Sequence, residues 1–105
     1  MMNSKFLGML GICTKAGATK SGAWAASDAI KSGKAHLVIV AMDASDSTKK
    51  DYEEMAAFNN AKFIVCSTKE ELGRACGKDE RAVVAITDKD LSDNLLSKIS
   101  LDGED

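Results

Sequence analysis

The sequence predicts an α/β fold, a three-layer α/β/α sandwich with a mixed four-stranded sheet. Helical stripes alternate along the chain with short apolar runs, which favours helices on both faces of one sheet. The apolar runs are unbroken, as is typical of strands covered on both sides. A length of 105 residues suits one domain with its own core. We therefore expect a single domain over 1–105, ordered from about 3 to 99 and ending in an acidic tail at 100–105.

The N-terminal third of the chain contains two helical patterns. Each has an apolar stripe, formed in the first by Phe6, Met9, Leu10 and Cys13 and in the second by Ala23, Ala26 and Ile30. Each also lies between residues that favour an N-cap and a glycine that favours a helix end. These are Asn3 or Ser4 and Gly17 for the first helix, and Ser21 or Gly22 and Gly33 for the second. The segment 18–20 between them is predicted to be short and extended.

Strands and helices alternate through the rest of the chain. Apolar runs of strand length lie at 37–42, 63–66 and 82–87, and the first of them is predicted to be the central strand. Helices are predicted at 45–58, at 68–77 and from 88 onward, and Thr68 and Glu71 have the spacing of a capping box. The side chains expected to be buried are Val38, Val40, Ile64, Val84 and Leu95.

Charge is distributed unevenly along the chain. The formal net charge is −2. Residues 1–40 nevertheless carry a local balance of +4, and the remainder therefore carries −6. The basic residues of this N-terminal part are Lys5, Lys15, Lys20, Lys31 and Lys34, against Asp28 alone. A basic surface is thus compatible with an acidic protein, because the local potential decides whether phosphate is attracted.

The cysteines and the histidine indicate neither a disulfide framework nor a zinc site. Cys13, Cys66 and Cys76 are odd in number, lack the Cys-x-x-Cys spacing and lie in apolar stretches, so we expect reduced, buried thiols. His36 cannot complete a zinc site with them at this spacing.

No apolar run is long enough to cross a bilayer and no cleavable leader is evident. The expectation is a cytoplasmic protein without metal, cofactor or membrane partner.

The common enzyme motifs are missing from the sequence. Gly-x-Gly-x-x-Gly and Gly-x-Ser-x-Gly do not occur, and the segment 16–21 only imitates a phosphate-binding loop, because Thr19 stands where a glycine must precede Lys20. Asp43 follows the central strand, where catalytic carboxylates are common, but a loop or capping role is the more frequent one. We expect no catalytic residues and keep an enzyme with a cleft beside Asp43 as an alternative.

The junction before the second helix has features of a binding site. A helix N-terminus leaves N–H groups free, here expected at Ser21 and Gly22, and Lys20 lies just outside it. Trp24 is out of phase with the apolar stripe, on the same side as Lys31 and close to Asp28. Trp24 either packs against a neighbouring helix or offers a stacking surface, and Asp28 with Lys31 has the spacing of a surface ion pair.

Several short segments of the sequence together form a pattern that is specific for one protein family. They are Gly8-x-x-Gly11, Lys15-Ala16-Gly17, Ser21-Gly22, the segment from Ile30 to Ser45, and Glu71-Leu72-Gly73-Arg74-Ala75-Cys76-Gly77. Together they resemble the ribosomal L7Ae superfamily, and in particular its small bacterial YlxQ-type members. The resemblance covers about residues 6–99. It implies the α/β/α sandwich and, as the usual activity of the family, binding to kink-turn RNA.

Two segments depart from the pattern of the kink-turn binders. In those proteins the second helix begins with glycine, any residue, asparagine, glutamate, two residues and lysine, and the polar side chains read sheared G·A pairs. This chain keeps Gly22 but has Trp24, Ala25 and Asp28 at the three polar positions, which removes that base-edge hydrogen bonding. The second departure is the loop after Gly77, which is charged here and apolar in those members.

The prediction is a non-catalytic RNA-binding module for structured, kink-turn-like RNA, with the ribosome or another protein as further partners. Recognition is expected to rely on phosphate contacts and stacking, with a target that differs from or is broader than that of strict kink-turn readers. The alternative is a protein-interaction adaptor that uses the same face through Trp24. The expected RNA-binding residues are Lys15, Lys20, Ser21, Gly22, Trp24, Ala25, Asp28, Lys31, Lys34, Lys78, Arg81 and Ala82.

Overall fold

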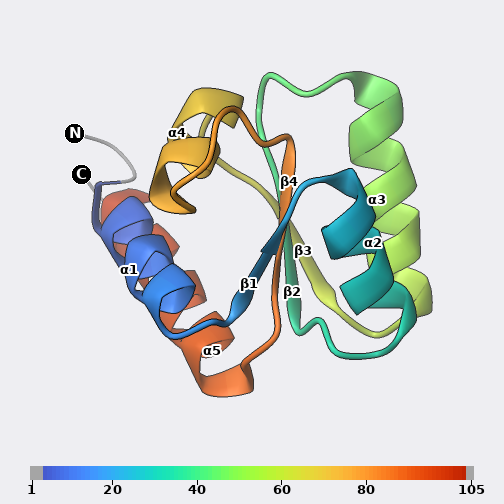
Figure 1. Ribbon diagram of the computed structural model, residues 1–105, viewed down its shortest axis with the longest axis horizontal. Coiled ribbons are helices and arrows are strands. Elements are labelled where there is room, and N and C mark those ends of the chain that lie inside the picture. The colour runs from blue at the N-terminus through green and yellow to red at the C-terminus, as the bar shows by residue number, and fades with distance from the viewer. Residues whose placement is uncertain (1–3, 104–105) are drawn as a thin grey trace.

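Helices and strands alternate in the computed structural model, which describes residues 4–103 (Figure 1). In chain order the elements are α1 (Ser4–Lys15), β1 (Thr19–Ser21), α2 (Ala23–Lys31), β2 (Leu37–Val40), α3 (Asp46–Phe58), β3 (Lys62–Val65), α4 (Lys69–Ala75), β4 (Val83–Ile86) and α5 (Lys89–Gly103). Helix α5 continues past the predicted boundary at 99. Asn3, a predicted cap, and the tail residues 104–105 lie outside the described residues.

The four strands form one mixed sheet in the order β1-β4-β2-β3. Strand β2 pairs in parallel with β3 and antiparallel with β4, and β4 pairs antiparallel with β1. Helices α2 and α3 cover one face, and α1, α4 and α5 cover the other (Figure 1). The predicted α/β/α sandwich is therefore confirmed, and the segment at 18–20 supplies most of its fourth strand.

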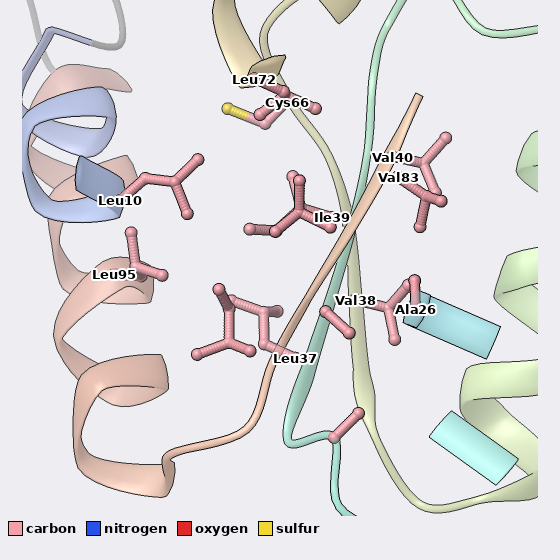
Figure 2. Close-up of a cluster of buried hydrophobic side chains, with 14 of the residues drawn as sticks. Leu10, Ala26, Leu37, Val38, Ile39, Val40, Cys66, Leu72, Val83 and Leu95 are labelled. Carbon is pink, nitrogen blue, oxygen red and sulfur yellow. The ribbon is translucent and has the colours of Figure 1, made fainter. Parts of the chain in front are cut away.

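Side chains that alternate along β2 fill two half-cores, because successive residues of a strand point to opposite faces of the sheet. One half-core contains Leu10, Leu37, Ile39 and Leu95, and the other contains Ala26, Val38, Val40 and Val83 (Figure 2). All four residues of β2 are fully buried, as are those of β4. The predicted burial of Val38, Val40, Val84 and Leu95 is confirmed, and so is that of the α1 stripe.

Three details of the prediction are wrong. Strand β3 lies at the edge of the sheet, so Ile64 is only partly buried and Val65 is 42% exposed. The central strand ends at Val40 instead of continuing to Met42, whose N–H donates to the Ser67 carbonyl at 2.7 Å as the chain turns away. Ala23 is exposed, because it belongs to the first turn of α2, where the chain enters the helix from β1.

Side-chain caps mark the starts of two helices, and the one at Thr68 is the predicted capping box. The Ser45 hydroxyl accepts the Thr48 N–H at 3.1 Å at the start of α3. At the start of α4 the capping box forms, with the Thr68 hydroxyl accepting the Glu71 N–H at 3.1 Å and the Glu71 carboxylate accepting the Thr68 N–H at 3.0 Å. Within residues 4–103 no helix is both long and apolar enough to cross a membrane.

All three cysteines are free thiols and buried, as predicted. Burial raises the pKa of Cys13 above its ordinary value of 9.0, and the negative charge of Asp88 adds to the effect. Burial likewise raises the pKa of Cys76, and hydrogen bonding from Thr14 opposes it. Because the thiolate is the reactive form, burial makes these two side chains poor nucleophiles in the folded protein.

We expect the buried thiols to resist alkylation in the folded protein. At pH 8, iodoacetamide should modify Cys13 and Cys76 at least about a hundredfold more slowly in buffer than in concentrated urea, because reaction requires opening of the core. Mass spectrometry of tryptic peptides measures both rates. Equal rates in buffer and in urea would show that the α1–α4 contact opens readily.

Candidate functional site

The junction between β1 and α2 is built around Gly22. Its φ of +92° lies in the region that favours glycine. Its N–H donates to the Val83 carbonyl at 2.9 Å, and its carbonyl accepts the Ala26 N–H at 2.9 Å. The expectation of a free N–H at Gly22 is therefore wrong, because this group continues the β1–β4 ladder. No side chain caps α2, so the N–H groups of Ala23, Trp24 and Ala25 in its first turn have no partner among the described residues.

The loop between α4 and β4 faces this junction. A Cβ placed on Gly22 would lie 3.6 Å from Nε and 3.7 Å from Cδ of Arg81, so the arginine side chain crosses directly over the glycine. The Arg81 guanidinium donates to the Glu80 carbonyl at 2.9 Å. Together the two segments form an open depression of ≈ 470 Å³, which we call the Gly22 hollow. Its lining residues are Ser21, Gly22, Ala23, Trp24, Ala25, Glu80, Arg81 and Ala82.

Gly73 of α4 sets the path of that loop. A Cβ at Gly73 would lie 1.6 Å from the carbonyl oxygen and 2.6 Å from the carbonyl carbon of Asp79, so the loop backbone rests directly on the glycine. The Gly73 carbonyl accepts the Lys78 N–H at 2.8 Å, and the Lys69 carbonyl accepts the Arg81 N–H at 3.0 Å. The loop thus runs back along α4 and presents Arg81 to Gly22.

Trp24 separates the Gly22 hollow from a second depression. Its side chain is 83% exposed, so the expectation that it packs against a neighbouring helix is wrong for this chain. The second depression, of ≈ 480 Å³, is called the Trp24 hollow and is lined by Ala23, Trp24, Ser27, Asp28 and Lys31. Among the described residues Asp28 and Lys31 form no ion pair, although their spacing would allow one.

Tyr52 of α3 holds the first two turns of α2 in place. Its hydroxyl lies 3.0 Å from the Ser27 hydroxyl and donates to the Ala23 carbonyl at 3.3 Å. Tyr52 is itself buried. Its two hydrogen bonds therefore link the part of α2 that carries Trp24 to α3, the neighbouring helix on the same face of the sheet. Neither Ser27 nor Tyr52 was among the predicted site residues. Helical spacing from Trp24 could have indicated Ser27, but nothing local indicates a contact from α3.

The other predicted residues are placed at different distances from the two hollows. Lys20 is exposed on β1, next to the residues that line the Gly22 hollow. Lys15 precedes the opposite end of β1, and Lys34 follows the opposite end of α2, about 13 Å along the helix axis. Lys78 lines a separate depression, together with Glu70, Arg74, Asp79 and Glu80. The structure therefore brings Arg81 and Lys31 to depressions that Trp24 also lines, whereas Lys15, Lys20, Lys34 and Lys78 line neither of them.

The charges near the two hollows nearly cancel. Lys20, Lys31 and Arg81 are positive, whereas Asp28 and Glu80 are negative. Such a surface attracts phosphate only where a cation and the free N–H groups of α2 coincide, because the neighbouring carboxylates weaken the field elsewhere. The exposed indole supplies a stacking face for a flat, uncharged group. The surface can bind a ligand that presents both phosphate and aromatic rings.

Asp43 has a structural role in this chain. Its Oδ1 accepts the Lys69 N–H at 2.9 Å, which satisfies one of the free donors at the start of α4. Asp43 therefore ties the loop after β2 to α4.

His36 lies at the other end of β2 from Asp43. It lines another depression, together with Asn60, Lys62, Lys89, Ser92 and Asp93.

Comparison with known proteins agrees with this architecture. The chain is 29% identical over 97 residues to the RNA-binding protein YlxQ of Bacillus subtilis (strain 168), an alignment that covers 92% of this chain and 97% of that protein. A Bacillus halodurans protein described as having unknown function superposes with a TM-score of 0.86 at 31% identity, covering 92% of this chain and 98% of the other. A Giardia lamblia 15.5kD RNA binding protein superposes with a TM-score of 0.74 at 27% identity, covering 95% and 83%.

The family assignment rests on nearly the whole length of the chain. A model of the ribosomal protein L7Ae/L30e/S12e/Gadd45 family matches residues 5–96. The match spans every strand, helices α2 to α4 and all of α1 except Ser4, so it includes both segments that meet at Gly22. The chain therefore belongs to the ribosomal protein L7Ae/L30e/S12e/Gadd45 family.

Proposed function

We propose that this protein is a non-catalytic RNA-binding protein of a bacterial cytoplasm, and that it binds structured RNA at the Gly22 and Trp24 hollows. The carrying observation is that an uncapped helix start, an arginine and an exposed tryptophan meet at one place. The relative from Bacillus subtilis, named an RNA-binding protein, aligns over almost the full length of both chains. The Giardia structure, also named RNA-binding, shares the fold.

Phosphate binding and base stacking fall to different residues in this proposal. The free N–H groups of Ala23, Trp24 and Ala25, with Arg81 above them, form a phosphate site at the start of α2. Lys20 adds a cation on the same side. The Trp24 ring stacks on a base that the RNA leaves unpaired, as aromatic side chains do in single-strand and loop recognition.

The target preference should differ from that of kink-turn readers. Trp24, Ala25 and Asp28 replace the asparagine, glutamate and lysine that read sheared G·A pairs in those proteins, and each of the three lines at least one of the two hollows. We therefore propose structured RNA with unpaired nucleotides as the target, including but not limited to kink-turns and ribosomal RNA. Folded loops and bulges meet this requirement, whereas a plain duplex does not.

We expect binding to weaken with salt by an amount that reports the phosphate contacts. The log–log slope of affinity against KCl should be about −0.7 to −0.9 per neutralised phosphate. Lys20→Ala and Arg81→Ala should each flatten the slope by about one such step, because each removes one cation from a phosphate. Fluorescence anisotropy on a bulged hairpin and on a duplex of equal length measures both.

Lys34→Ala is the matched control for these variants. Lys34 is an exposed lysine that follows α2 and lines neither hollow, so its loss should leave the slope unchanged. If Lys34→Ala flattens the slope as much as Lys20→Ala, the RNA surface extends along the whole helix. Failure of the natural protein to bind either RNA at low salt would overturn the proposed function.

A protein-interaction adaptor remains the second candidate function. The observation that favours it is the same 83% exposure of Trp24, because tryptophans surrounded by polar residues are common anchors of protein interfaces. An adaptor would require no phosphate contact, and its binding would lack the steep salt dependence expected for RNA. The salt series therefore separates the two functions.

A further inference from the structure

We propose that the Trp24 hollow holds one unpaired guanine of the bound RNA, stacked on the indole and hydrogen-bonded by Asp28. This inference rests on the proposed RNA-binding function and names the nucleotide that one part of the site selects. It starts from three side chains that share one face of α2. Trp24, Asp28 and Lys31 follow each other at spacings of four and three residues, and all line the same depression.

The indole is held ready for stacking. Its helix is tied to α3 through Tyr52, which contacts both the Ser27 hydroxyl and the Ala23 carbonyl on either side of Trp24 in the sequence. An exposed ring on a fixed backbone loses little conformational freedom when a flat group covers it. The ≈ 480 Å³ of the depression lies in the size range of small-molecule sites, and its open side leaves room for the sugar and phosphate outside.

Asp28 decides which base is favoured. The carboxylate forms no ion pair within the described residues, so both of its oxygens are free to accept hydrogen bonds. It lies in a surface that we propose to bind RNA, which is itself negatively charged. A carboxylate there repels phosphate and contributes to binding only if the ligand brings donors to it. The Watson–Crick edge of guanine carries two adjacent donors, N1–H and the 2-amino group, which match the two oxygens. Adenine, cytosine and uracil each present one donor group there, next to acceptors that a carboxylate repels.

Lys31 completes the complementarity. Beside its two donors, the same edge of guanine carries one acceptor, O6. An ammonium group is a donor with no acceptor capacity, and Lys31 lies one turn after Asp28 in the same depression. The order acceptor, donor, donor on the base is thus answered by one cation and one carboxylate.

The test uses RNA hairpins that are identical except for one unpaired loop nucleotide. The natural protein should bind the guanine hairpin about tenfold more tightly than the adenine, cytosine or uracil hairpins, as expected for one bidentate contact. Inosine, which lacks only the 2-amino group, should lose most of this advantage. The 7-deazaguanine hairpin keeps the Watson–Crick edge and should bind as guanine does.

Two variants assign the preference to the proposed residue. Asp28→Asn replaces one acceptor oxygen by an amide donor, so it should weaken guanine binding about tenfold and change binding of the other three hairpins much less. Asp51→Asn, an exposed carboxylate of α3 that lines neither hollow, is the matched control and should leave all four affinities unchanged.

The outcomes distinguish this inference from the function on which it rests. Equal affinity for all four hairpins, or a guanine preference that persists in Asp28→Asn, would overturn the guanine site and leave RNA binding intact. Absence of binding to every hairpin would overturn both. A preference that is present in the natural protein and lost in Asp28→Asn, but kept in Asp51→Asn, supports the assignment.

Discussion

Replacing Gly73 by alanine should destabilise the protein by about 3 kcal/mol and weaken ligand binding at the same time. The added Cβ would lie 1.6 Å from the Asp79 carbonyl oxygen, so the loop backbone must move away from α4. That loop carries Arg81 over Gly22. Urea unfolding measures the loss of stability. A loss of this size leaves an ordinary domain folded, so RNA affinity of the variant can be measured as well.

Gly8→Ala is the matched control for this substitution. Gly8 is exposed in α1, and a Cβ there would meet nothing within 4 Å. Both variants gain the same helix propensity, which alone should stabilise Gly8→Ala by about 0.5–1 kcal/mol. The difference between the two variants therefore measures the steric conflict at Gly73. A Gly73→Ala protein as stable as Gly8→Ala would show that the loop does not rest on α4 as described.

The arrangement of the core could be predicted because it follows from local patterns. Unbroken apolar runs and helical stripes indicate which faces are buried, and the capping box at Thr68 indicates where α4 begins. The place of β3 at the sheet edge could not be predicted in the same way. A four-residue apolar run looks the same in a central and in an edge strand, and the order β1-β4-β2-β3 arises from contacts between distant segments.

The candidate site was predictable in part for the same reason. The start of α2 and the phase of Trp24 are local features, and the loop after Gly77 came from the family resemblance. Three other features are set by contacts across the fold. Arg81 lies over Gly22, Tyr52 supports α2, and the Gly22 N–H is used by β4. No spacing along the chain encodes these contacts.

The opposing charges at the site have a physical consequence for recognition. A surface with Asp28 and Glu80 beside Lys31 and Arg81 gains little from attracting phosphate in general. Discrimination must then come from groups that fit a particular nucleotide, and part of the affinity from contacts that do not depend on net charge. Stacking on Trp24 is the contact of that kind with the largest expected contribution.

Trp24→Ala should lower RNA affinity by about 1–3 kcal/mol, or roughly 5- to 150-fold, at every salt concentration. The slope of affinity against salt should stay as in the natural protein. The uncharged indole neutralises no phosphate, so its loss does not change the number of counterions released on binding. Stability should change little, since 83% of the side chain is exposed. Anisotropy titrations over the KCl series, together with urea unfolding of the variant, measure these three quantities.

Phe58→Ala and Trp24→Phe make this prediction specific. Phe58 is an aromatic side chain of α3 that is 88% exposed and lines neither hollow, so its loss should leave RNA affinity unchanged. Phenylalanine at 24 keeps a stacking ring and should retain most of the affinity. If instead Trp24→Ala binds RNA as tightly as Phe58→Ala, no base stacks on the indole. A different result would support the adaptor function. If the natural protein binds neither RNA and the Trp24→Ala variant loses a protein partner, this surface binds that partner through the exposed ring and makes no phosphate contact.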